Sequence, residues 1–258
     1  SGGAVMNAQG QLIGIHGQGE TDSKMSEQQG VAVKTGTNQA VPIAYYSQYS
    51  TGAAVVAAST QAATADDYLA QATAILSKGL EINDKTTEQA FLRIFNLADS
   101  ALRLSPNNVD AYALRARARA GRGQFREAIE DANKALSLKP TNWNALFARA
   151  NAKSSLGDKQ GAISDFNQAI AINPQDAYAY INRGNAKYAL GDRQGAIADY
   201  NQAILINPQD AYAYKNRGTA KYALGDKQGA IVDLNQAISV NPQYANAYIN
   251  RGIVKLAL

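Results

Sequence analysis

A period of 34 residues organises most of this sequence. The dipeptide Gly-Asp recurs at 157–158, 191–192 and 225–226, and proline recurs at 106, 140, 174, 208 and 242. Residues 177–210 and 211–244 differ at only eight of 34 aligned positions. A fixed period in this range predicts stacked supersecondary units, each burying its apolar side against its neighbours, rather than one globular core.

The sequence of one unit, 177–210, predicts two helices joined by a tight turn. Asp176 is placed to cap a first helix that runs to about Leu190. Gly191 supplies a left-handed residue that ends this helix. Asp192 then caps a second helix that runs to about residue 206, and Pro208 blocks its continuation.

This pattern resembles the tetratricopeptide repeat (TPR), whose period is also 34 residues. Tyr180, Gly184, Ala196, Tyr200 and Pro208 stand at its characteristic Trp, Gly, Ala, Phe and Pro positions, whereas Arg183 and Lys187 replace its usual Leu and Tyr. The resemblance implies an all-α fold, a solenoid of helical hairpins. Full repeats are expected at 109–142, 143–176, 177–210 and 211–244, with a partial repeat at 245–258.

An atypical first pair of helices is expected at 65–108. Its helices are predicted over about 65–82 and 87–104. Thr86 and Gln89 have the spacing of a capping box, which predicts that the second of these helices begins just after Thr86.

Arginine and aspartate recur together, 16 residues apart, in every full repeat. The pairs are Arg115 and Asp131, Arg149 and Asp165, Arg183 and Asp199, and Arg217 and Asp233. We expect a ladder of ion pairs that fixes the register of the two helices and that is not itself a ligand site.

In TPR arrays the first helices line a concave groove, so the resemblance implies a set of groove positions here. They are Asn144, Phe147, Asn151, Tyr178, Ile181, Asn182, Asn185, Tyr188, Tyr212, Lys215, Asn216, Thr219, Tyr222, Asn246, Ile249, Asn250 and Ile253. Asparagine offers one acceptor and two donors, and tyrosine offers contact area at low entropic cost. This chemistry suits a peptide segment of a protein partner. The alternative is that these residues only keep the inner face in contact with water.

Two other binding modes have less support. Some TPR proteins hold a C-terminal carboxylate with Lys and Asn at set groove positions. Lys215 fits that pattern, but Thr219 and Ile181 replace the expected Asn and Lys. The formal net charge is only +4 and no run of five or six like charges exists, so nucleic acid is not an expected partner.

Residues 1–50 have a different composition, with short apolar runs between turn signals. Ser1-Gly2-Gly3 precedes apolar runs at 4–6 and 12–15, and further strand-like runs follow at 30–33 and 40–43. This order resembles the C-terminal end of a trypsin-like serine peptidase domain, with Ser1 at the place of the nucleophile. The resemblance implies a fragment of that β-barrel, followed by a low-complexity linker at 51–64.

This chain alone lacks the other groups that serine peptidase chemistry requires. The family's His base, its Asp and a glycine N–H of the oxyanion hole all precede the nucleophile. The single histidine, His16, follows Ser1 and matches a wall of the substrate cleft. We expect a non-catalytic chain, with a serine endopeptidase in a longer parent protein as the alternative. Ser1 acting through its own α-amine is a further option.

The remaining expectations concern cofactors, surroundings and assembly. The chain has no cysteine, which excludes a thiolate metal site, and we expect neither a metal nor a cofactor. No stretch approaches about 18 apolar residues, so no membrane span is predicted. Unpaired strand edges could support an oligomer. Both ends look cut from a longer protein, and the peptidase resemblance implies a location outside the cytoplasm.

Overall fold

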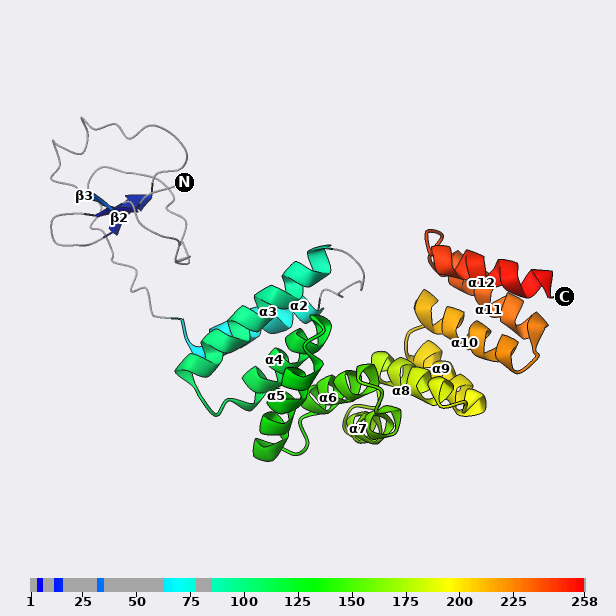
Figure 1. Ribbon diagram of the computed structural model, residues 1–258. Helices are drawn as coiled ribbons and strands as arrows, with labels where there is room; N and C mark the ends of the chain where they lie inside the picture. The colour runs from blue at the N-terminus through cyan, green and yellow to red at the C-terminus, as the bar shows by residue number, and fades with distance from the viewer. Residues whose placement is uncertain (1–3, 7–11, 16–31, 35–62, 78–84, 258) are drawn as a thin grey trace. The chain divides into compact units, whose positions relative to one another are not determined.

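The computed structural model describes residues 4–6, 12–15, 32–34, 63–77 and 85–257 of the 258-residue chain. The chain divides into two units, Ser1–Ser59 and Thr60–Leu258. Both units are drawn in Figure 1.

The first unit contains three short strands, β1 (Ala4–Met6), β2 (Leu12–Ile15) and β3 (Ala32–Lys34). The sheet order is β2-β1-β3, and both pairs are antiparallel, with Ala4 opposite Ile15 on one side and Lys34 on the other. The expected strand at 40–43, and the linker apart from residues 63 and 64, lie outside the described residues. The assignment of residues 1–50 to the end of a peptidase barrel stays a prediction.

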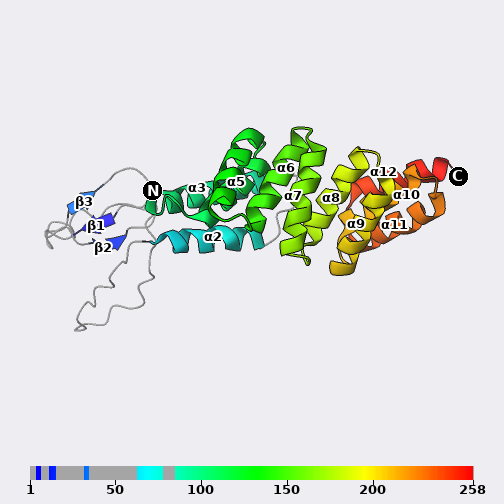
Figure 2. The same ribbon diagram turned by 90° about the horizontal axis from the view of Figure 1, so that it is seen from below.

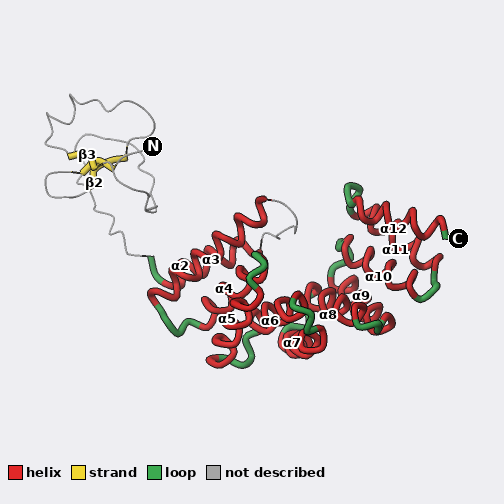
Figure 3. The backbone as a smooth tube through the Cα atoms, viewed as in Figure 1, coloured by secondary structure: helices red, strands yellow, loops and turns green. Residues whose placement is uncertain are grey.

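The described part of the second unit contains helices and connecting turns (Figure 3). The helices are α2 (Ala65–Ser77), α3 (Lys85–Leu104), α4 (Val109–Gly121), α5 (Phe125–Leu138), α6 (Trp143–Ser155), α7 (Lys159–Ile172), α8 (Ala177–Ala189), α9 (Arg193–Ile206), α10 (Ala211–Ala223), α11 (Lys227–Val240) and α12 (Ala245–Leu256). Consecutive helices pack as pairs, and each pair packs on the next (Figure 2). The expected all-α solenoid of helical hairpins is confirmed in this unit.

The caps of the hairpin formed by α8 and α9 are those the sequence predicts. The Asp176 carboxylate accepts hydrogen bonds from the backbone N–H groups of Tyr178 and Ala179 at the start of α8. Asp192 accepts one from the N–H of Gly195 at 2.8 Å and so caps α9. Between them Gly191 has φ +87°, a left-handed conformation that side chains with a Cβ rarely adopt.

The first helix pair differs from the sequence expectation at the start of its second helix. Helix α3 begins at Lys85, so Thr86 lies inside the first helical turn and is not the N-cap; the capping-box prediction is wrong. A capping box needs its Thr just outside the helix, where the hydroxyl can reach the free N–H groups. Helix α2 is described to Ser77, and the expected extension to residue 82 lies outside the described residues.

Small residues let the two helices of a hairpin approach closely. Ala196 and Ala203 are completely buried, and Gly184 faces the ring of Tyr200, which is itself buried. A Cβ added at Gly184 would lie 2.7 Å from the ring. One repeat earlier, Ala150 and Phe166 occupy the corresponding places. Alanines make up much of the core, and one aromatic or aliphatic side chain from each later second helix fills the remaining space.

Candidate functional site

The first helices of successive pairs lie closer together than the second helices do. Helices α4, α6, α8, α10 and α12 contact one another in succession, whereas among the described helices no contact of similar extent joins α5, α7, α9 and α11. Stacked pairs that touch on one side and spread on the other place the first helices on the inner side of a curve. We call this side, which carries Arg117, Asn151, Asn185 and Thr219, the first-helix face.

Hydrogen bonds between asparagine side chains join neighbouring first helices along this face. Asn182 donates to the side-chain oxygen of Asn151 at 3.1 Å, and Asn216 donates to that of Asn185 at 3.0 Å. Asn250 donates to the Thr219 hydroxyl at 3.1 Å. These polar groups therefore hold one repeat against the next, and only their remaining donors and acceptors are available to a ligand.

The predicted groove residues divide by their burial. Tyr178 and Tyr212 stand at equivalent places on α8 and α10 and are 60% and 45% exposed. The other exposed or half-buried positions of the set lie on α6, α8, α10 and α12. They are Asn144, Asn151, Asn182, Asn185, Tyr188, Lys215, Thr219, Tyr222, Asn246, Ile249, Asn250 and Ile253.

Three of the predicted positions are buried in the structure. Ile181 packs with Ala203 and Ala213 between repeats, and Phe147 packs edge-on against Phe166. Asn216 is buried beneath Lys215, whose Nζ donates to the Asn216 side-chain oxygen at 2.6 Å. We correct the prediction for these residues: they support the face from below and do not form its wall.

Two cations on the first-helix face are packed against aromatic rings. The Nζ of Lys215 lies 4.7 Å from the centre of the Tyr212 ring, and the guanidinium of Arg117 lies 5.1 Å from that of Phe147. Burial lowers the pKa of both groups, because the charged form loses solvent.

The four predicted Arg–Asp pairs are bidentate in the structure. In the third repeat, Arg183 Nε and Nη2 donate to the two carboxylate oxygens of Asp199 at 3.0 and 2.6 Å. The same arrangement joins Arg115 to Asp131, Arg149 to Asp165 and Arg217 to Asp233. All four aspartates are almost completely buried. The hydrogen bonds from Arg115 to Asp131 raise the pKa of Arg115 against the opposing effect of desolvation.

Sequence reasoning missed two further members of this ladder. Lys187 Nζ lies 2.9 Å from Asp199, and Arg183 Nη1 donates to Asn167 of the previous repeat at 2.7 Å. Lysines and asparagines at the equivalent places repeat the arrangement: Lys153, Lys221, Asn133 and Asn201. Both residue types recur with the 34-residue period, so that period was the available signal. The arginine Nε, Nη1 and Nη2 groups and both oxygens of each aspartate are engaged within the chain, which favours the structural role that the sequence predicts.

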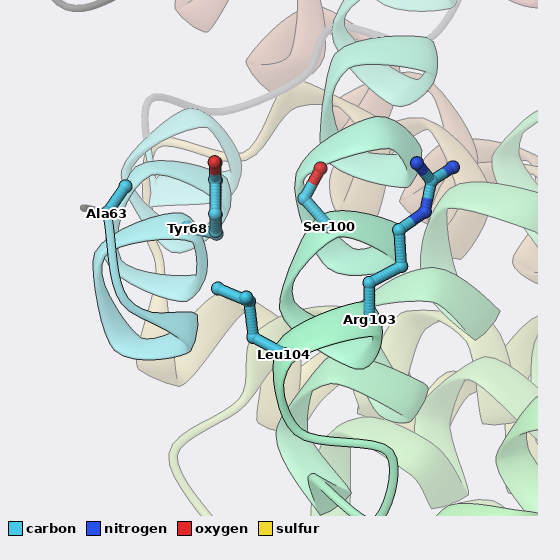
Figure 4. Close-up of a pocket in the computed structure, with 5 residues that line it drawn as sticks. All are labelled: Ala63, Tyr68, Ser100, Arg103 and Leu104. Carbon is cyan, nitrogen blue, oxygen red and sulfur yellow. The ribbon is translucent and has the colours of Figure 1, made fainter.

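The hollow between the first two helices is not a candidate site. A hollow of about 340 Å³ between α2 and α3 is lined by Ala63, Tyr68, Ser100, Arg103 and Leu104, and it is open to solvent (Figure 4). Among the described residues, no group of acidic or histidine side chains is arranged to hold a metal ion. Within the same residues, no helix has the length and apolar character needed to cross a membrane.

Stacked antiparallel helix pairs with a 34-residue period define a helical repeat scaffold. Family models of the tetratricopeptide repeat match residues 109–142 and 191–251, and a TPR repeat model matches residues 150–191. The helical unit is a tetratricopeptide repeat array. Such arrays are generally non-catalytic scaffolds for interactions between proteins.

Several solved structures share this fold. The crystal structure of MamA is 27% identical, with a TM-score of 0.54, covering 62% of this chain and 94% of that one. A thermophilic TPR protein from Thermus thermophilus is 18% identical, with a TM-score of 0.60, covering 75% and 100%. YrrB, described as a TPR protein with an unusual peptide-binding site, is 20% identical, with a TM-score of 0.54, covering 73% and 92%. No curated protein sequence matches this chain significantly.

Proposed function

We propose that the array binds a peptide segment of a protein partner on its first-helix face. The observation that carries this proposal is the exposure of Tyr178 and Tyr212 at equivalent places on consecutive first helices. The row of asparagines lies on the same helices, with amide groups that can hydrogen-bond a peptide backbone. The general role of TPR arrays as interaction scaffolds supports the same function.

We expect the two tyrosines to favour binding because each combines a large apolar area with a fixed position on its helix. A tyrosine ring buries a large area on binding and loses few rotamers, because it has only two side-chain torsions. Exposed aromatic residues of this kind commonly dominate the energy of an interface. The asparagine bonds between repeats hold the helices that carry them in place before a ligand arrives.

The test is a selection of binding peptides from a random dodecapeptide library, followed by affinity measurements on the selected sequences. A Tyr178→Ala/Tyr212→Ala variant is expected to bind them at least about tenfold more weakly, because both rings lie in the contact. Since both side chains are exposed, its circular dichroism spectrum and melting temperature should stay close to those of the parent chain.

Leu205→Ala is the matched control, since Leu205 is 74% exposed on the second helix α9. Peptides that lose affinity with Leu205→Ala and keep it with the tyrosine variant would place the binding surface elsewhere and contradict the proposal.

A second proposal concerns the parent protein: residues 1–50 are the end of a trypsin-like peptidase domain, and Ser1 is the nucleophile of a serine endopeptidase there. It rests on Ser1-Gly2-Gly3 and on the order of apolar runs that follows. In that parent the array would direct the peptidase to its partners. For residues 1–258 produced alone, a fluorophosphonate probe is expected to leave Ser1 unlabelled, because the attack by serine needs the family's His base and orienting Asp, which that family places on the N-terminal side of the nucleophile. Mass-spectrometric detection of probe on Ser1, absent in Ser1→Ala, would contradict the expectation.

A further inference from the structure

Arg117 differs from every ladder arginine in how many of its N–H groups are used. Arg115, Arg149, Arg183 and Arg217 each donate through Nε, Nη1 and Nη2 to side chains of neighbouring helices. Arg117 donates only through Nη1, to the side-chain oxygen of Asn144 at 2.6 Å, within the described part of the chain. Because a guanidinium has five N–H donors, most of those on Arg117 have no acceptor in this part of the protein.

The guanidinium is nevertheless held in one place. It lies 5.7 Å from the ring centre of Trp143 and 5.1 Å from that of Phe147, and these two rings meet edge to face. Phe147 is buried against Phe166 and cannot easily move. Together with Asn144, the two rings form a fixed seat for a planar cation at the junction of α4 and α6.

No carboxylate neutralises this cation at close range. Among the described residues, other cations of the first helices form ion pairs with Asp99 or with the ladder aspartates, and Arg117 takes part in none of these pairs. These cations are Arg115, Arg119, Arg149, Lys153, Arg183, Lys187, Arg217 and Lys221.

Two carboxylates that could serve as a counter-ion are otherwise engaged. Asp176 attracts Arg117 without forming an ion pair, and its Oδ1 is occupied by two backbone N–H groups of α8. Asp110 on α4 is exposed and accepts from Asn142. Arg117 is half-buried, so its unpaired N–H groups still reach solvent, and a partly desolvated cation without a counter-ion costs free energy that an incoming anion would recover.

We propose that Arg117 is the anion-binding point of the first-helix face and takes a carboxylate side chain, Asp or Glu, of the bound partner segment. This inference rests on the proposed peptide-binding function and names the chemistry of the peptide. A carboxylate placed against Arg117 would accept two N–H bonds in the planar, bidentate geometry that a guanidinium favours. The ligand is then acidic where it crosses α4 and α6, and aromatic or aliphatic where it reaches Tyr178 and Tyr212.

The experiment uses the same library selection and the chain's only tryptophan. Peptides selected on the parent chain are expected to be enriched in Asp and Glu over the input library, and this enrichment is expected to disappear with Arg117→Gln. Trp143 adjoins Arg117, so its fluorescence reports binding at this place. Changing the selected acidic residue of a peptide to Asn or Gln is expected to weaken binding at least about tenfold, and to change little on Arg117→Gln.

The control is Arg126→Gln, which removes the same charge from an exposed place on the second helix α5. Equal enrichment of acidic residues on Arg117→Gln and on the parent would overturn the inference. So would selected peptides without acidic residues that still depend on Tyr178 and Tyr212, and in that case the proposed function stands. If selection enriches no peptide at all, both fail. A phosphoserine version of the peptide that binds better than the Glu version would replace carboxylate by phosphate as the ligand.

Discussion

An Asp199→Asn variant is expected to unfold at a clearly lower urea concentration than the parent chain, with a free energy of unfolding about 3 kcal/mol smaller. Asp199 is 3% exposed and faces two cations, Arg183 and Lys187. Asparagine keeps the shape but removes the negative charge, so both cations lose their counter-ion. The loss falls at the low end of the range for broken buried pairs, because both cations keep some contact with solvent.

The measurement is urea denaturation followed by circular dichroism, with hydrogen exchange to locate the change. In repeat arrays each unit contacts mainly its neighbours, so lost protection should centre on α8, α9 and the helices beside them. Glu130→Gln is the control, since Glu130 is an exposed carboxylate on α5 and should shift the transition by less than about 0.5 kcal/mol. Equal transitions for both variants would mean that the ladder is a solvated surface network.

The sequence predicted those parts of the structure that depend on one repeat alone. Asp176, Gly191 and Asp192 mark the ends of α8 and α9 because caps and left-handed turns are set by a few neighbouring residues. The 16-residue spacing of Arg183 and Asp199 also lies within one helical hairpin. Its geometry follows once the two helices are known to be antiparallel.

The accessible residues of the first-helix face could not be predicted in the same way. The bonds from Asn182 to Asn151 and from Asn216 to Asn185 link residues 31 positions apart in different repeats. Whether such residues meet depends on the rotation between one helix pair and the next, and the period does not determine this rotation. The burial of Ile181 has the same cause, because it packs on Ala213 of the following repeat.

The same limit explains why Arg117 does not stand out in the sequence. Five arginines occur between 115 and 126, and a charge count treats them alike. Only the structure separates Arg115, which is bound to Asp131 and Asp99, from Arg117, which rests on two aromatic rings. Trp143 and Phe147 come from the next repeat, so this seat too depends on stacking between repeats.

A Gly184→Val variant is expected to lose about 3 kcal/mol of stability, whereas Gly252→Val should stay within about 0.5 kcal/mol of the parent. The two glycines occupy the same place in their repeats. A Cβ at Gly184 would lie 2.7 Å from the Tyr200 ring, but one at Gly252 would meet nothing within 4 Å. Thermal melting of the two variants measures the difference directly. Because the helix propensity change is the same at both sites, a similar loss in both would contradict the packing explanation.

The stability cost of a smaller substitution at Gly184 should depend on the side chain that packs against this position. Gly184→Ala is expected to cost about 1 kcal/mol, since the clash with Tyr200 outweighs the better helix propensity of alanine. The ring cannot shift freely, because its hydroxyl donates to the Asn185 side chain at 2.8 Å.

One repeat earlier the chain combines Ala150 with Phe166, which has no hydroxyl to anchor it. In a Tyr200→Phe background, Gly184→Ala should therefore be nearly neutral. A double-mutant cycle by urea denaturation measures this coupling, and additive effects would mean that the hydroxyl does not hold the ring in place.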